Sequence, residues 1–200
     1  MSILKRHRAK RPRLRLDDKI IADWNCLAVA AITEAGLAFG RLDWINAADR
    51  AFNASLRALT ATADAFKGRL HQSAVGGTPG APATLQGLAE MARAALILFE
   101  ATGKKDYLGL ASKWAYAVVT HHWDEAGPTV ARLKQVRDEP NASGNGKMTE
   151  VLALLYYLGG DARHQDRANH TLFAVGGDAE EPALEASRLY NAADTIDAAL

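Results

Sequence analysis

Acidic residues in loop-like segments are the first candidates for chemistry in this chain. Asp17 and Asp18 stand just before a helical pattern, and Asp138 stands in a segment rich in glycine and proline. Hydrolysis of a glycosidic bond needs two carboxyl groups on opposite sides of a pocket, roughly 5–9.5 Å apart. We therefore take Asp18 and Asp138 as the candidate catalytic pair. The simpler interpretation is that each carboxylate caps a helix.

Residues that can contact a sugar lie close to these acids. Trp24 could stack on a sugar ring while Asn25 bonds its hydroxyls, although Trp24 also fits the apolar stripe of a core helix. Residues 143–145 could present backbone N–H groups at a helix start, or serve as a plain cap. Lys19 follows two acids and is better read as an ion-pair partner than as a base. The candidate substrate-binding residues are Asp17, Lys19, Trp24, Asn25, Ser143, Gly144 and Asn145.

Cofactor and metal sites are not indicated by the residue types or their spacing. The six histidines match no metal-ligand pattern, and no glycine-rich phosphate loop occurs. The single cysteine, Cys26, can form no internal disulfide and is expected to be a buried, inert thiol. We expect no cofactor, no metal and a reducing, cytoplasmic environment.

Helical periodicity covers most of the chain and predicts an all-α protein. Apolar residues recur at intervals of three and four, and glycine or proline clusters separate the periodic segments. Residues 68–82 and 124–145 are expected to be loops, with Thr129–Val136 as a possible short extended piece. The predicted helices are 20–39, with Asp17 and Asp18 as its cap, and 43–65, 83–101, 105–122, 147–158, 161–174 and 181–198.

The joints between these helices repeat. A glycine is followed after four residues by an aromatic or imidazole ring and after eight by an alanine. Glycine tolerates the positive φ at a helix end, and alanine lets two helices approach. This pattern predicts three αα-hairpins that must stack, because each alone buries only one face. The joints are Gly40–Trp44–Ala48, Gly103–Tyr107–Ala111 and Gly160–His164–Ala168.

The N-terminus differs in charge from the rest of the chain. Residues 1–15 hold seven of the 24 basic residues and no acidic one, so the remainder is net negative. We divide the chain into a basic arm, 1–16, and a helical domain, 17–200. Nucleic-acid binding by the arm is a further alternative function; against it, no aromatic residue stands among the basic ones to stack on bases. No apolar run is long enough to span a membrane.

Several segments, in order, resemble the thioredoxin-domain-containing family of spermatogenesis-associated protein 20 and its bacterial relatives. The first is similar to the opening of the family's C-terminal part, and the later ones to its joints and turns. These segments are Lys10–Arg11–Pro12, Asp17–Asp18–Lys19, Trp24–Asn25, Phe99–Gly103, Trp123–Asp124, Ser143–Gly144–Asn145 and Leu155–Asp161.

The resemblance implies stacked αα-hairpins that form part of an (α/α) toroid of the six-hairpin glycosidase type. About three hairpins are expected, without the family's thioredoxin domain, and the terminal hairpins should expose apolar flanks. A homodimer or a thioredoxin-like domain is the partner this suggests. The family's Glu-Asp-Tyr cluster reads Gln86-Gly87-Leu88 here. We therefore expect a carbohydrate-binding or interaction module with little or no catalysis; the alternative is a sugar hydrolase or epimerase.

Overall fold

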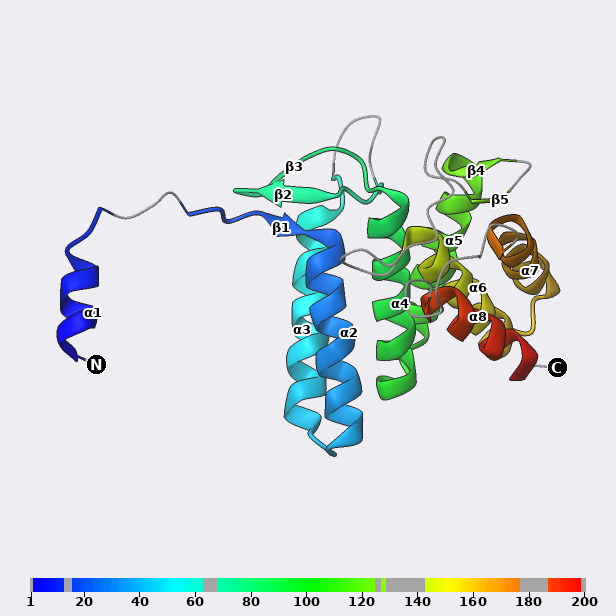
Figure 1. The fold of residues 1–200 in the computed structure, drawn as a ribbon, viewed down its shortest axis with the longest axis horizontal. Helices are drawn as coiled ribbons and strands as arrows, with labels where there is room; N and C mark the ends of the chain where they lie inside the picture. The colour runs from blue at the N-terminus through cyan, green and yellow to red at the C-terminus, as the bar shows by residue number, and fades with distance from the viewer. Residues whose placement is uncertain are drawn as a thin grey trace.

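The chain forms a stack of helices (Figure 1). The computed structural model describes residues 2–12, 16–62, 68–124, 127–128, 143–176 and 187–198. The all-α class expected from helical periodicity is confirmed. The helices in these ranges are α1 (Ser2–Ala9), α2 (Ala22–Ala38), α3 (Leu42–Leu59), α4 (Leu85–Thr102), α5 (Lys105–His121), α6 (Gly144–Gly159), α7 (Ala162–Gly176) and α8 (Ser187–Ala198).

Three hairpins, α2–α3, α4–α5 and α6–α7, share the predicted joint. The glycine of each joint has a positive φ, which costs a residue with a Cβ roughly 1–2 kcal/mol but costs glycine little. The alanine eight positions later is at most 1% exposed in all three hairpins. The predicted repeat is therefore confirmed. The φ angles are 63° at Gly40, 68° at Gly103 and 69° at Gly160.

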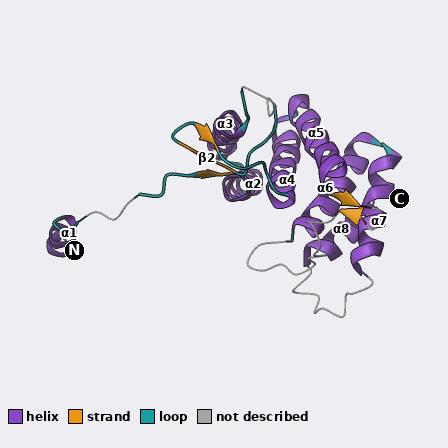
Figure 2. Ribbon diagram, turned by 90° about the horizontal axis from the view of Figure 1, so that it is seen from above, coloured by secondary structure: helices purple, strands orange, loops and turns teal. Residues whose placement is uncertain are grey.

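The hairpins stack so that their helices form two layers. The first helices, α2, α4 and α6, contact one another in succession, and α8 packs on α6. Each second helix packs mainly on the first helix of its own hairpin. Figure 2 shows α3 and α5 on one side of α2 and α4. Because α4 contacts α2, α5 and α6, every residue from Gly87 to Leu98 is buried.

The segment 68–82, expected to be a loop, instead contains two strands of a small antiparallel sheet. β2 (Ser73–Val75) pairs with β3 (Thr78–Pro79) on one side and with β1 (Ile20–Ile21) on the other. The turn between β2 and β3 is Gly76–Gly77, and both glycines have positive φ. Two glycines of this kind suit a tight hairpin. A second pair of strands, β4 (Trp123–Asp124) and β5 (Gly127–Pro128), follows α5.

The start of α2 corrects a predicted cap. Its N-cap residue is Ile21, and no side chain caps it. The preceding residues are held in β1, so Asp17 and Asp18 lie too far along the extended chain to reach the helix start. The backbone N–H of Ala22 instead donates to the carbonyl oxygen of Gln72, at 2.9 Å. The residue just before β2 therefore supplies the hydrogen bond that we assigned to an acidic side chain.

The basic arm contains an element that the sequence did not predict. Residues Ser2–Ala9 form α1, which Figure 1 shows standing apart from the hairpins. Its basic side chains, among them Lys5, Arg6 and Arg8, are exposed. No helix among the described residues combines the length and apolar character needed to cross a bilayer. The division into an arm and a helical domain stays a prediction.

Candidate functional site

The predicted acids before α2 lie at the surface. Asp17, Asp18 and Lys19 are exposed and line an open hollow of about 400 Å³ with two apolar side chains. The ammonium of Lys19 donates to Asp17 at 3.0 Å, as the ion-pair interpretation expects. This hydrogen bond is the main reason that the pKa of Asp17 lies below its usual range. Asp138 lies outside the described residues, so its pairing with Asp18 stays a prediction.

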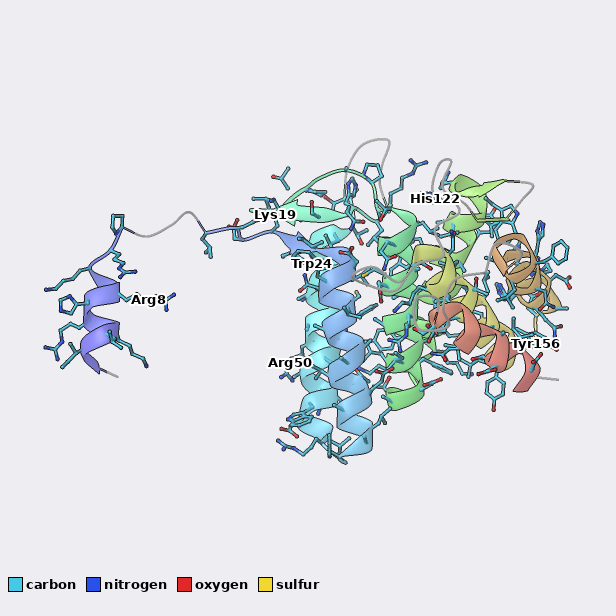
Figure 3. All side chains as sticks on the ribbon, viewed as in Figure 1. Arg8, Lys19, Trp24, Arg50, His122 and Tyr156 are labelled. Atoms are coloured by element: carbon cyan, nitrogen blue, oxygen red, sulfur yellow. The ribbon has the colours of Figure 1, made fainter. Side chains whose placement is uncertain are left out.

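The two predicted residues in the first turn of α2 differ in their surroundings. Trp24 is 63% exposed, so it belongs to the surface and not to the core. Figure 3 shows Trp24 at the N-terminal end of α2, which follows Lys19 in the chain. The side-chain amide of Asn25 donates to the carbonyl oxygen of Ile21, at 2.8 Å. Trp24 is therefore available for stacking, whereas one donor of Asn25 is already used within the helix.

The predicted residues at the start of α6 are buried. The hydroxyl oxygen of Ser143 accepts a hydrogen bond from the N–H of Gly146 at 3.0 Å, so Ser143 is a helix cap. A Cβ on Gly144 would lie 3.2 Å from Cγ of Leu85 and 3.3 Å from the backbone nitrogen of Gln86. Glycine thus lets the starts of α6 and α4 approach closely. Asn145, 1% exposed, stands next to this contact.

The starts of α2 and α4 also lie close together, so three helix N-termini gather at one end of the layer. A Cβ on Gly87 would lie 3.6 Å from Cβ of Ala22 and 2.5 Å from Oε1 of Gln72. That oxygen accepts hydrogen bonds from the backbone nitrogen and the hydroxyl of Thr84, at 3.1 and 3.0 Å. The N-terminal rim, as we call the first turns of α2, α4 and α6, is held by these contacts. The positive ends of three helix dipoles meet there.

Two buried charges between α4 and α6 were not found from the sequence. Lys147 and Glu90 are 3.1 Å apart, and their side chains are only 1% and 2% exposed. The side-chain amide of Gln86, one turn before Glu90, also donates to it at 3.4 Å. Because a buried charge is costly without a partner, this pair ties the faces of α4 and α6 together.

Arg93 continues the same polar face of α4. Its guanidinium donates to Glu150 of α6 at 3.2 Å and to Glu34 of α2 at 2.7 Å. Burial alone would lower the pKa of Arg93, but the two carboxylates outweigh this and raise it. The ion-pair row, defined as Glu34, Glu90, Arg93, Lys147 and Glu150, thus links the three helices of one layer.

A signal for this row was present in the sequence. Gln86, Glu90, Arg93 and Glu100 follow one another at intervals of four, three and seven, which places them on one face of a helix. Polar residues at these intervals in an otherwise apolar helix indicate partners on the neighbouring helices. The periodicity of residues 83–101 predicted a helix without this polar face.

Metal and thiol chemistry find no support in the part of the chain that the structure describes. No group of three histidine, cysteine, aspartate or glutamate side chains is placed there to hold a metal ion. Cys26 is fully buried, with its sulfur 2.8 Å from that of Met91. Burial, with smaller contributions from Glu90 and Asp23, raises the pKa of its thiol far above the usual range. This thiol is inert at neutral pH.

Solved structures share this arrangement of helices. A cellobiose 2-epimerase from Bacillus thermoamylovorans matches with a TM-score of 0.68 over 94% of this chain and 57% of its own, at 13% identity. A family 76 glycoside hydrolase (mannosidase) from Bacteroides thetaiotaomicron matches with a TM-score of 0.65 over 91% and 55%, at 11% identity. Another family 76 glycoside hydrolase, from a bovine strain of that species, matches with a TM-score of 0.66 over 91% and 44%, at 12% identity.

These comparisons show the fold. The chain has the hairpin stack of the α/α toroid proteins and spans about half the length of the solved structures it matches. No family model matches the sequence. No curated protein matches it either.

Proposed function

We propose that this chain binds carbohydrate through part of an α/α toroid and performs little or no catalysis of its own. The observation that carries this proposal is that two carboxylates in the layer of first helices are held in ion pairs with cations. Glu90 and Glu150 lie in the layer of first helices, but each is held by a buried cation at 3.1 or 3.2 Å. A general acid or base must be able to exchange a proton with a substrate, and these carboxylates are committed to ion pairs.

The N-terminal rim supports carbohydrate as the ligand class. Trp24 presents an exposed ring beside Asn25, and stacking on aromatic rings with hydrogen bonds to amides is how proteins hold sugars. The proteins with matching folds include an enzyme named for cellobiose and a mannosidase. We keep Asp17, Lys19, Ser143, Gly144 and Asn145 as further candidate contacts at or near this rim.

The test is calorimetric titration of the full chain with cellobiose and with mannobiose, alongside chromatography for products. We expect binding without product, and several-fold weaker binding in Trp24→Ala because the stacking surface is lost. Tyr157→Ala is the matched control, since Tyr157 is also 63% exposed but lies on α6 outside the rim. Equal affinity in Trp24→Ala and the original chain would contradict the proposed site.

A sugar-processing enzyme is the second candidate, and Glu100 is the observation in its favour. Its pKa is raised because its carboxyl is partly withdrawn from water and because Glu34 is near, with Arg93 acting in the opposite direction. A carboxyl group with a raised pKa near a second carboxyl group is the arrangement found in acid and base pairs. If product appears in the assay, its loss in a variant identifies a catalytic carboxyl group. The variants to compare are Glu100→Gln, Asp18→Asn and Asp138→Asn.

The resemblance to the spermatogenesis-associated protein 20 family and the reducing, cytoplasmic environment remain parts of this proposal. The first rests on the sequence segments that resemble the family, and no family model matches the chain. The burial of the single cysteine in the core is in keeping with the second.

An uncovered apolar flank supports the proposed partner, a second copy of the chain. Ala28 and Ile32 of α2 are exposed and lie on the opposite side of the helix from Cys26, which contacts α4. Ala47, Ala51 and Ala54 of α3 are exposed on the side away from α5. In a stack, this is the side on which another hairpin packs.

Light scattering after size-exclusion chromatography tests the partner. We expect a homodimer, and a shift to monomer in Ile32→Glu because a charge would enter the apolar contact. Ile3→Glu on α1 is the control, since Ile3 is exposed but distant from the flank. A monomeric original chain would exclude the second copy and leave a thioredoxin-like domain as the remaining candidate.

A further inference from the structure

A cavity lies outside the layer of first helices. It has a volume of about 330 Å³ and opens between the second half of α5, the start of α4 and the chain that leads into β2. This volume is at the lower end of the range of small-molecule sites, about 300–1,000 Å³. Its walls include Leu70, Leu88 and Trp114, which are 6%, 6% and 4% exposed.

The lining of this cavity is apolar inside, and basic side chains stand at its edge. Arg69, Lys113, His121 and His122 all line it, and none of the described residues that line it is acidic. The ammonium of Lys113 donates to the carbonyl oxygen of Gly68 at 3.2 Å, which holds it beside the opening. Burial and the neighbouring His121 lower the pKa of His122, so its ring is a neutral hydrogen-bonding group at pH 7. Such a lining suits a molecule with an apolar body and one anionic end.

The cavity is separate from the polar face of α4. Leu88 lines the cavity, whereas Glu90 and Arg93 face α6 and α2. Residues two apart on a helix point in nearly opposite directions, so Leu88 and Glu90 belong to opposite sides of α4. A ligand in the cavity would therefore lie on the opposite side of α4 from the ion-pair row, and Trp24 is not among the described residues that line the cavity.

We propose that this cavity binds an amphipathic organic anion, with the apolar chain between Leu88 and Trp114 and the carboxylate or similar group at Lys113. Burial of the chain supplies the affinity, because the walls are already withdrawn from water. The ammonium of Lys113, with its carbonyl partner, supplies a charge-assisted hydrogen bond that orients the ligand. Sugars, which lack both an apolar chain and a charge, are not expected to bind there.

Quenching of tryptophan fluorescence by 10-bromodecanoate tests the proposal on the full chain. The bromine quenches only a ring that it touches, so we expect saturable quenching that disappears in Trp114→Phe and is reversed by decanoate. Lys113→Met should weaken binding about tenfold, since a hydrogen bond to a charged group is lost. Lys105→Met, an exposed lysine of the same helix outside the cavity, should bind as the original chain does.

Two results would overturn the proposal. One is equal competition by decyltrimethylammonium, which would show that the charge of the ligand does not matter. The other is unchanged quenching in Trp114→Phe, which would place the probe at another tryptophan such as the exposed Trp24. If Trp114→Phe fails to fold, the comparison of Lys113→Met with Lys105→Met decides, and equal affinities would reject the site.

Discussion

Replacing Lys147 by methionine is expected to lower the free energy of unfolding by about 3–5 kcal/mol. Lys147 is 1% exposed, and its ammonium lies 3.1 Å from Glu90, which is equally withdrawn from water. Methionine keeps most of the volume but removes the positive charge, so the carboxylate of Glu90 is left buried without its cation. Urea denaturation followed by circular dichroism measures the change.

Two further variants separate this effect from a loss of packing. In the double variant Glu90→Leu with Lys147→Met both charges are absent, so most of the lost stability should return. Lys104→Met removes an exposed lysine whose contact with Asp49 is a surface ion pair, worth about 0–1 kcal/mol. If Lys147→Met and Lys104→Met cost the same, the buried pair does not hold α4 against α6, and the proposed division between structural and substrate-binding residues loses its support.

Most of the helical architecture was predictable because its signals are local. The spacing of apolar residues sets each helix, and the glycine of each joint needs a positive φ that the sequence can specify at one position. The structure confirms the predicted helices. It also confirms the positive φ at Gly40, Gly103 and Gly160. The sheet was missed because β1 and β2 are 54 residues apart at their paired positions Ile20 and Ala74, and such pairing depends on contacts distant in the sequence.

The candidate site was less predictable than the fold. Ser143 as a cap and Lys19 as an ion-pair partner followed from neighbours within three residues. The ion-pair row depends on helices that meet only after folding: Arg93 joins residues 57 and 59 positions away. The intervals on α4 identify the polar face, but only the stacked hairpins show that Lys147 and Glu150 oppose it.

Replacing Phe52 by alanine is expected to lower the free energy of unfolding by about 3–5 kcal/mol. Phe52 is fully buried where α3 meets α5, with its ring centroid 5.4 Å from that of Tyr107 and 6.2 Å from that of Trp114, both edge to face. Alanine removes the ring from both contacts and leaves a cavity that the two hairpins cannot close without moving. Thermal and urea denaturation both report this loss.

Phe173→Ala is the matched control, because Phe173 is 87% exposed and its loss should change stability by less than about 0.5 kcal/mol. The comparison also bears on the proposed anion site, since Trp114 is both a wall of that cavity and a neighbour of Phe52. We therefore expect Phe52→Ala to weaken binding of decanoate as well, while Phe173→Ala leaves it unchanged. Full retention of both stability and binding in Phe52→Ala would show that the two hairpins are held together elsewhere.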